Sequence, residues 1–255
     1  MVADIITVAK RNIIRVFRTP ELLVFSTIQP IMFVLLFNYV FGGAIPIPGV
    51  EYINFLIPGI IIQTATFGAS NTAIGLTEDL QAGIVDRFRS LPMARSAVLA
   101  GRVLADTLRN LWVILLSVGI GYLIGFRFQA GFVSAVLAIL IATLFAFAMS
   151  WVFAAMGLLT KTPEAAQAAV FVPIFPFTFA SSAFVPTETM PGWLQAFAEN
   201  QPVTAAINAM RYLVLGESEF LNLNSGQVVE ALAWSLLIFG VFFYVAVRLY
   251  RRSSE

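Results

Sequence analysis

The chain alternates between long apolar runs and short polar segments. A helix needs about 20 residues to cross a bilayer, and six of the runs approach or exceed that length. They cover about residues 20–41, 52–73, 96–126, 132–159, 164–179 and 228–249. The third run is polar on one side as far as Arg109 and becomes apolar from Leu111. The pattern therefore predicts an all-α integral membrane protein with six transmembrane helices.

Two of these helices begin with the same three residues. At Thr19-Pro20-Glu21 and at Thr162-Pro163-Glu164, threonine can cap the helix, proline suits its first turn and glutamate favours its N-terminal dipole. Proline inside a helix removes a backbone hydrogen bond. Pro173 and Pro176 therefore predict a fifth span that is bent or interrupted.

Residues 1–18 have helical amphipathicity without the length of a crossing. At about 100° per residue one face is apolar and the other carries Asp4, Arg11, Arg15 and Arg18. Such a helix lies in the membrane surface. The alternative, a helix packed on a soluble core, is disfavoured because no soluble domain remains to receive it.

The segment 181–225 differs from the other connections because it is semi-polar and repeatedly apolar. It predicts two short helices, at about 189–197 and 202–215. Trp193, Leu194 and Phe197 on one side suit an interfacial or partly re-entrant element rather than a crossing.

Residues 77–96 form a densely charged loop. Thr77 can cap a short turn, with Glu78 and Asp79 in its first positions and Gly83 as its break. A second short helix then follows, with an apolar stripe at i, i+4 and i+7 opposite two arginines: Ile84, Phe88 and Leu91 against Arg87 and Arg89. This pattern favours a helix that fits a groove on a partner protein. The alternative is a membrane-surface helix with snorkelling arginines.

Charge placement gives the orientation. Hydrophobic residues make up 59% of the chain and charged residues 11%, too apolar a balance for a soluble fold. Of the 15 Lys and Arg residues, all except Arg127 and Arg211 lie on the side of the termini and the 77–96 loop. The positive-inside rule then places both termini in the cytoplasm. The net charge of +1 does not indicate a nucleic-acid partner.

The inventory of side chains excludes several chemistries. Cysteine and histidine are absent, so thiolate and imidazole sites are excluded. The predicted spans carry almost no ionisable residue at mid-depth, which argues against an ion-coupled carrier and an intramembrane lipid-modifying enzyme. Arg102, Asp106 and Arg109 lie near the cytoplasmic end of the third span, spaced to pair along one helix face. No Gly-x-x-x-x-Gly-Lys-Ser/Thr phosphate loop is present, so a transport function requires a separate ATPase.

Polar residues gather in the second span, where they could line a pathway or join helices by hydrogen bonds. They are Gln63, Thr64, Thr66, Ser70 and Asn71. For any one of them the residues favour the hydrogen-bonding role.

Three stretches carry a resemblance to a known family. They are Gly83-Ile84-Val85-Asp86-Arg87-Phe88-Arg89-Ser90-Leu91-Pro92 followed by Gly101-Arg102-Val103-Leu104-Ala105-Asp106, then Met190-Pro191-Gly192-Trp193-Leu194, and Asn200-Gln201-Pro202-Val203-Thr204 with Arg211. The chain resembles the ABC-2 family of ABC exporter permeases along nearly its whole length, and most closely the daunorubicin-resistance-type branch. Broader family members tend to read Asn-Pro where this chain reads Asn200-Gln201-Pro202, which fits that branch and makes polysaccharide export a weaker expectation.

The resemblance implies one permease domain over residues 1–255. Residues 1–18 would be the elbow helix and 181–225 the extracellular re-entrant segment. The ATPase-coupling residues would be Gly83, Ile84, Asp86, Arg87, Phe88, Arg89 and Leu91. A pathway for a drug, antibiotic, lipid or glycolipid would run between the first, second and fifth helices, past Gln29, Asn38, Gln63, Thr64, Asn71, Phe171 and Phe175.

The resemblance also implies an assembly in the plasma (inner) membrane of a prokaryote. A second permease subunit, identical or related, would complete the channel among membrane lipids. Separate nucleotide-binding subunits would hold ATP and Mg²⁺, so we expect no cofactor in this chain and no catalysis by it.

Overall fold

The computed structural model describes residues 2–18, 20–42, 45, 47, 49–84 and 95–252. The regular structure of these residues is helical, apart from one isolated β-bridge between Ser218 and Leu223. The α-helices are α1 (Val2–Arg18), α2 (Pro20–Leu36), α3 (Tyr52–Gln81), α5 (Arg95–Leu123), α6 (Phe132–Leu159), α7 (Pro163–Phe179), α8 (Gly192–Glu199), α9 (Pro202–Leu215) and α10 (Gly226–Arg252). A π-helix, Phe37–Phe41, continues α2, and a 3₁₀ turn, Thr187–Thr189, precedes α8.

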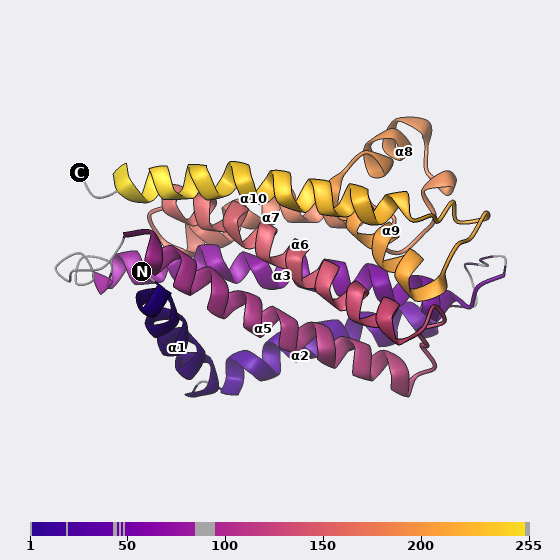
Figure 1. Cartoon of the computed structure of the whole chain (residues 1–255), viewed down its shortest axis with the longest axis horizontal. Coiled ribbons are helices and arrows are strands. Elements are labelled where there is room, and N and C mark those ends of the chain that lie inside the picture. Colours follow the sequence, from indigo (N-terminus) through magenta and orange to yellow (C-terminus); the bar gives the residue numbers. More distant parts are fainter. Residues whose placement is uncertain are drawn as a thin grey trace.

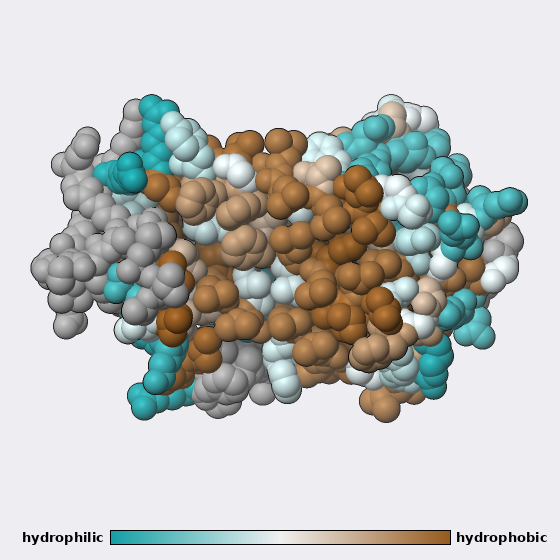
Figure 2. All heavy atoms as spheres, in the orientation of Figure 1, coloured by the Kyte–Doolittle hydropathy of each residue, from teal (hydrophilic) through white to brown (hydrophobic). Residues whose placement is uncertain are grey.

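The longer helices form an elongated bundle (Figure 1). α1 crosses the bundle at one end, where both chain termini lie, and α8 and α9 lie at the opposite end. Figure 2 shows a broad apolar belt across the middle of the molecule, with hydrophilic residues gathered toward its two ends. This is the surface expected of a protein whose middle faces lipid.

Four of the described helices are long and apolar enough to cross a membrane: α3, α5, α6 and α10. α3 is the most enclosed of them, because 83% of the residues in its 18-residue apolar stretch are buried, whereas the share for α10 is 17%. α2 and α7 are shorter, at 17 residues each. The helical class is therefore confirmed, and α3 is the helix that packs against α2, α5, α6, α7 and α9.

Small residues let α3 and α6 approach closely. A Cβ added at Gly157 of α6 would lie 2.6 Å from the carbonyl oxygen of Ala73 in α3. Thr77 completes this contact because its hydroxyl donates to the carbonyls of Ala73 and Gly157, both at 3.0 Å. Such spacing between backbones is typical of helix packing in membranes.

Several predicted boundaries are right. α6 and α9 begin and end at the predicted residues, and Thr162 caps α7, with its hydroxyl accepting a hydrogen bond from the Ala165 N–H at 3.2 Å. The Thr19 cap lies outside the described residues.

One local prediction is wrong: Thr77 does not begin a new turn, because α3 continues past Ala73 as far as Gln81. Of the bend or interruption predicted at Pro173 and Pro176, the interruption is absent, because α7 continues through both prolines. α7 packs on α3 and α6 through a small apolar cluster. That cluster contains Ala69, Ala73, Phe153, Val170 and Ile174. Packing on neighbouring helices is what allows proline inside a membrane helix.

Candidate functional site

Three charged residues of α5, Arg102, Asp106 and Arg109, lie together in the N-terminal half of the helix. Arg102 Nε donates to Asp106 Oδ2 at 3.0 Å, and Arg109 Nη2 lies 3.5 Å from Asp106 Oδ1. Thr72 of α3 donates its hydroxyl hydrogen to Asp106 Oδ2 at 2.9 Å. Asp106 is 4% exposed, so its charge is offset by these donors rather than by water.

Both arginines donate to backbone carbonyls of glycines in α3. Arg102 Nη1 donates to the Gly75 carbonyl at 3.4 Å, and Arg109 Nη2 donates to the Gly68 carbonyl at 3.3 Å. A Cβ at Gly75 would overlap the Arg102 guanidinium. We call this contact the charged seam, and its members are Gly68, Thr72, Gly75 and Asp79 of α3 with Arg102, Asp106 and Arg109 of α5.

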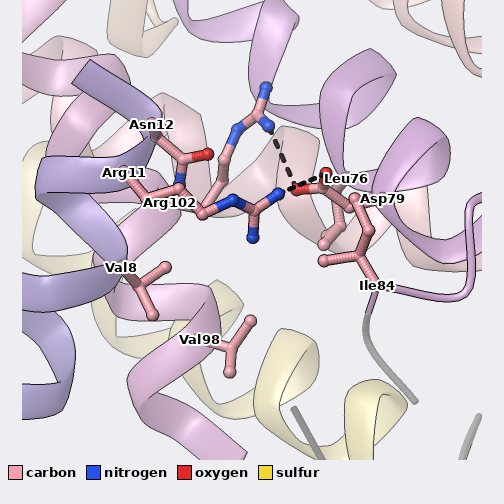
Figure 3. Close-up of a pocket in the computed structure, with 8 residues that line it drawn as sticks. All are labelled: Val8, Arg11, Asn12, Leu76, Asp79, Ile84, Val98 and Arg102. Carbon is pink, nitrogen blue, oxygen red and sulfur yellow. Dashed lines mark hydrogen bonds and ion pairs between the residues drawn. The ribbon is translucent and has the colours of Figure 1, made fainter. Parts of the chain in front are cut away.

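Asp79 extends the charged seam to α1. Its Oδ2 accepts from Arg102 Nη1 at 3.3 Å, and its Oδ1 accepts from Arg11 Nη2 at 3.4 Å. Figure 3 shows the two guanidinium groups approaching this carboxylate from two helices. Three helices therefore meet at one acidic side chain.

A cavity of about 10 Å³ lies beside Asp79, roughly the space of one water molecule. Its walls combine Arg11, Asp79 and Arg102 with Asn12 and with four apolar side chains: Val8, Leu76, Ile84 and Val98. Asn12 is 5% exposed, and its amide atoms have no protein hydrogen-bond partner among the described residues.

The predicted coupling residues follow directly after this junction. Gly83 adopts φ +63 just beyond the end of α3, a conformation that favours glycine, and Ile84 lines the cavity. Asp86, Arg87, Phe88, Arg89 and Leu91 lie outside the described residues. Of the predicted coupling residues, the described ones are thus Gly83, just after α3, and Ile84, beside the charged seam.

The polar residues of α3 divide between two faces. Thr66 and Ser70 are buried, and each donates to a carbonyl of its own helix, at 2.8 and 2.6 Å. Gln63 is also buried, at 3% exposed. Thr64 and Asn71 are partly exposed and share a face with Phe67.

That face of α3 meets α7 through aromatic rings. Phe67 lies 6.3 Å from Phe171 and 6.0 Å from Phe175, between ring centroids. Phe171 is 36% exposed and Phe175 49%. We call this surface the aromatic face, and its members are Thr64, Phe67, Asn71, Phe171 and Phe175.

A row of stacked phenylalanines joins the aromatic face to α2. Phe175 stacks on Phe179, Phe179 on Phe184 and Phe184 on Phe37, with centroids 5.5, 5.5 and 4.1 Å apart. Gln29 and Asn38 lie on this first helical segment, Gln29 exposed and Asn38 partly buried. The structure thus brings Phe171 and Phe175 to the face of α3 that carries Thr64 and Asn71, whereas Gln63 is buried away from it.

Sequence reasoning missed Phe67 and Phe184. Phe67 could have been found from its spacing of three residues from Thr64 and four from Asn71, which places it on their helix face. Phe184 lies in the connection between α7 and α8, where helical spacing gives no such signal.

A second polar cluster lies at the opposite end of the bundle. Arg211 of α9, expected among the outward basic residues, is 2% exposed. Its Nε donates to the Phe55 carbonyl at 3.0 Å, its Nη2 donates to the carbonyls of Ser182 and Ala183, and its guanidinium carbon lies 3.5 Å from the centre of the Phe55 ring. Gln201 donates to the carbonyls of Phe177 and Ala180, at 2.9 and 2.8 Å. Arg211 and Gln201 together hold the backbone at and just after the end of α7. We call these two residues the outer clamp, where outer means only the end of the bundle away from the chain termini.

Comparison with known proteins gives these features a family. Residues 3–215 match the ABC-2 type transporter family. The daunorubicin resistance ABC transporter permease protein DrrB1 of Streptomyces coeruleorubidus is 36% identical over 235 residues, which cover 92% of this chain and 81% of the relative. The probable doxorubicin resistance ABC transporter permease protein DrrC of Mycobacterium tuberculosis is 28% identical, with 90% and 81% covered. The putative transport permease ycf38 of Cyanophora paradoxa is 26% identical, with 98% and 89% covered.

The all-helical bundle and its apolar belt define a multi-pass membrane protein. The chain belongs to the ABC-2 type transporter family, whose permeases work with ABC ATPase partners. This confirms the resemblance inferred from the sequence.

Proposed function

We propose that the chain is the permease subunit of an ATP-driven exporter that moves a hydrophobic or amphipathic cargo out of the cytoplasm or inner leaflet by alternating access. The observation that carries the proposal is the 36% identity to a daunorubicin-resistance permease over 92% of the chain. The cargo class is a drug, antibiotic, lipid or glycolipid. ATP and Mg²⁺ are bound by separate nucleotide-binding subunits, and a second permease subunit completes the pathway.

The proposed topology has six crossings with both termini cytoplasmic, in the inner membrane of a prokaryote. α2 with its π-helix and α7 supply the two crossings beyond the four longest helices. The placement of both chain termini at one end of the bundle supports an even number of crossings (Figure 1). α8 and α9 are the proposed re-entrant helices on the outer side.

The aromatic face is the proposed cargo surface. Its exposed phenylalanine rings suit flat apolar cargo, because aromatic pairs are favourable in offset and edge-on geometries. Thr64 and Asn71 add hydrogen-bonding groups to the same face. In this proposal Gln29 and Asn38 lie along the route and Gln63 serves packing.

The proposed driving contact is the segment 84–91. Closure of the ATP-bound partner would push this segment and, through the adjoining α3 and α5, rock the helices between inward and outward openings. Coupling requires that the segment bind one state of the ATPase more tightly than another. Substitutions on the segment can therefore abolish coupling while the permease remains folded.

Replacing Phe88 with alanine, or reversing charge with Arg87→Glu, tests this contact. In proteoliposomes containing the permease and its ATPase, we expect cargo-stimulated ATP hydrolysis to fall about tenfold, within the usual range of coupling between sites. Phe220→Ala is a matched control, because Phe220 is 55% exposed in the connection between α9 and α10.

Three results would contradict the proposal. Normal stimulation in both variants removes the coupling role of 84–91. Transport by the purified chain alone under an ion gradient indicates a secondary carrier instead. Formation of a modified lipid without any ATPase indicates an enzyme.

A further inference from the structure

The carboxylate of Asp79 is divided between two helices. Oδ1 faces Arg11 of α1 at 3.4 Å, and Oδ2 faces Arg102 of α5 at 3.3 Å. Asp79 itself lies just before the end of α3 at Gln81, and Ile84 lines the adjoining cavity. A shift of this end of α3 therefore moves an acidic group that two other helices hold.

α1 packs mainly on α5 rather than on α3. The contact with α5 is close, because a Cβ at Gly101 would lie 2.7 Å from Cβ of Val8. The Arg11–Asp79 ion pair is thus a direct tie between α1 and α3, formed across a face where these helices share little apolar packing.

The two arginines depend on Asp79 to different degrees. Arg102 also donates to Asp106 at 3.0 Å and to the Gly75 carbonyl at 3.4 Å, so it keeps a carboxylate and a carbonyl when Asp79 is neutralised. The Arg11 side chain is 36% exposed, against 12% for Arg102. In the Asp79→Asn variant the buried Arg102 therefore still pairs with the carboxylate of Asp106, so the substitution is compatible with folding.

We propose that Asp79 is a positioning residue that ties the interfacial helix α1 to the end of α3, so that displacement of the segment after Ile84 reaches α1 as well as α5. The proposal rests on the proposed function only for the origin of that displacement. The tie itself is a property of the chain alone.

The chain contains no cysteine, so two introduced cysteines can carry spin labels without background. Lys10 on α1 and Ala82 after α3 are both exposed. In the K10C/A82C protein in lipid nanodiscs, we expect a narrow distance distribution. Asp79→Asn and Arg11→Gln should each broaden it at least twofold.

The double variant D79N/R11Q should give a distribution no broader than that of D79N alone, because D79N already removes the Arg11–Asp79 pair as well as the Arg102–Asp79 pair. Glu230→Gln is a matched control, since Glu230 is exposed in the first turns of α10, whereas Arg11 and Asp79 lie on α1 and α3. It should leave the distribution unchanged. An unchanged distribution in D79N, or additive broadening in the double variant, overturns the tie.

The second measurement uses the permease with its ATPase. In D79N the ratio of cargo-stimulated to basal ATP hydrolysis should fall about two- to tenfold, the usual range for substitutions along a coupling route. A ratio equal to wild type, with a broadened distance distribution, overturns the transmission of movement through Asp79. Failure of any ATPase to associate contradicts the proposed function instead, and the label distances still decide the tie.

Discussion

At the scale of single residues, Arg211 illustrates how a charge is held inside an apolar structure. Its donors reach the carbonyls of Phe55, Ser182 and Ala183, and its flat guanidinium lies on the Phe55 ring. The planar guanidinium presents its N–H donors in a rigid fork, so it can donate to several carbonyls at once. The ammonium of a lysine is a compact charge with three rotatable donors. The residue is therefore suited to fastening backbone that has no regular hydrogen-bond ladder.

Arg211→Met should destabilise the protein by about 2–4 kcal/mol, because it leaves buried carbonyls without donors. Thermal unfolding of the purified chain in detergent measures the loss. Arg127→Met is the matched control, since Arg127 is exposed on the same outer side. Equal unfolding temperatures for the Arg211 variant and wild type would show that the clamp contributes no stability.

At the scale of elements, α3 is held by small residues on one side and by charge on another. Gly157 of α6 lies against the Ala73 backbone, whereas the charged seam joins α3 to α5. Backbone cannot shift as a flexible side chain can, so the α3–α6 contact has little tolerance for added volume.

Gly157→Ala should therefore cost about 1–3 kcal/mol of stability, through a clash with the Ala73 carbonyl. Gly119→Ala is the matched control, because a Cβ there meets nothing within 4 Å. That control should be neutral or stabilise by up to about 1 kcal/mol, since alanine is the better helix former. Equal loss in both variants would mean that helix propensity rather than packing decides. Chemical denaturation in mixed micelles separates the two outcomes.

At the scale of the whole molecule, polar residues gather at both ends of the bundle and apolar residues between them (Figure 2). The charged seam lies near the end that holds both chain termini, and the outer clamp lies near the other (Figure 1). Polar contacts thus join the helices at each end of the bundle, whereas apolar packing around α3 joins them in the middle.

The proposed six crossings give a pattern of thiol accessibility in intact cells. Cysteines introduced at Glu217 and Gln195 should react with a membrane-impermeant maleimide added outside. Cysteines introduced at Lys10 and Lys161 should react only after permeabilisation. Glu217, Lys10 and Lys161 are exposed. The side chain of Gln195 donates an exposed hydrogen bond to Glu199. Labelling of the Lys161→Cys variant from outside would require a different number of crossings.

Much of the fold could be predicted from the sequence, because its signals are local. The apolar run of α6 and the Gln201-Pro202 start of α9 each specify an element without reference to distant residues. The extension of α3 through Glu78 and Asp79 could not be read in this way. Charged residues persist in that helix because Arg11, far away in sequence, and Arg102 lie beside Asp79.

The candidate site likewise contains contacts that local sequence predicts and contacts that depend on residues distant in sequence. Pairing of Arg102 with Asp106 follows from a spacing of four residues on one helix. The joining of Phe184 to Phe37, and of Arg211 to Phe55, depends on loops whose path only the folded structure gives. The buried place of Arg211 also could not be inferred from a rule that counts basic residues in loops.

The outer clamp has a consequence for the order in which the protein is made. The backbone at the end of α7, at Phe177 and Ala180, is held by Gln201, and that of Ser182 and Ala183 by Arg211. Both clamping residues leave the ribosome after the segment they hold. During synthesis, this end of α7 therefore stays without its hydrogen-bond donors until α9 has emerged from the ribosome.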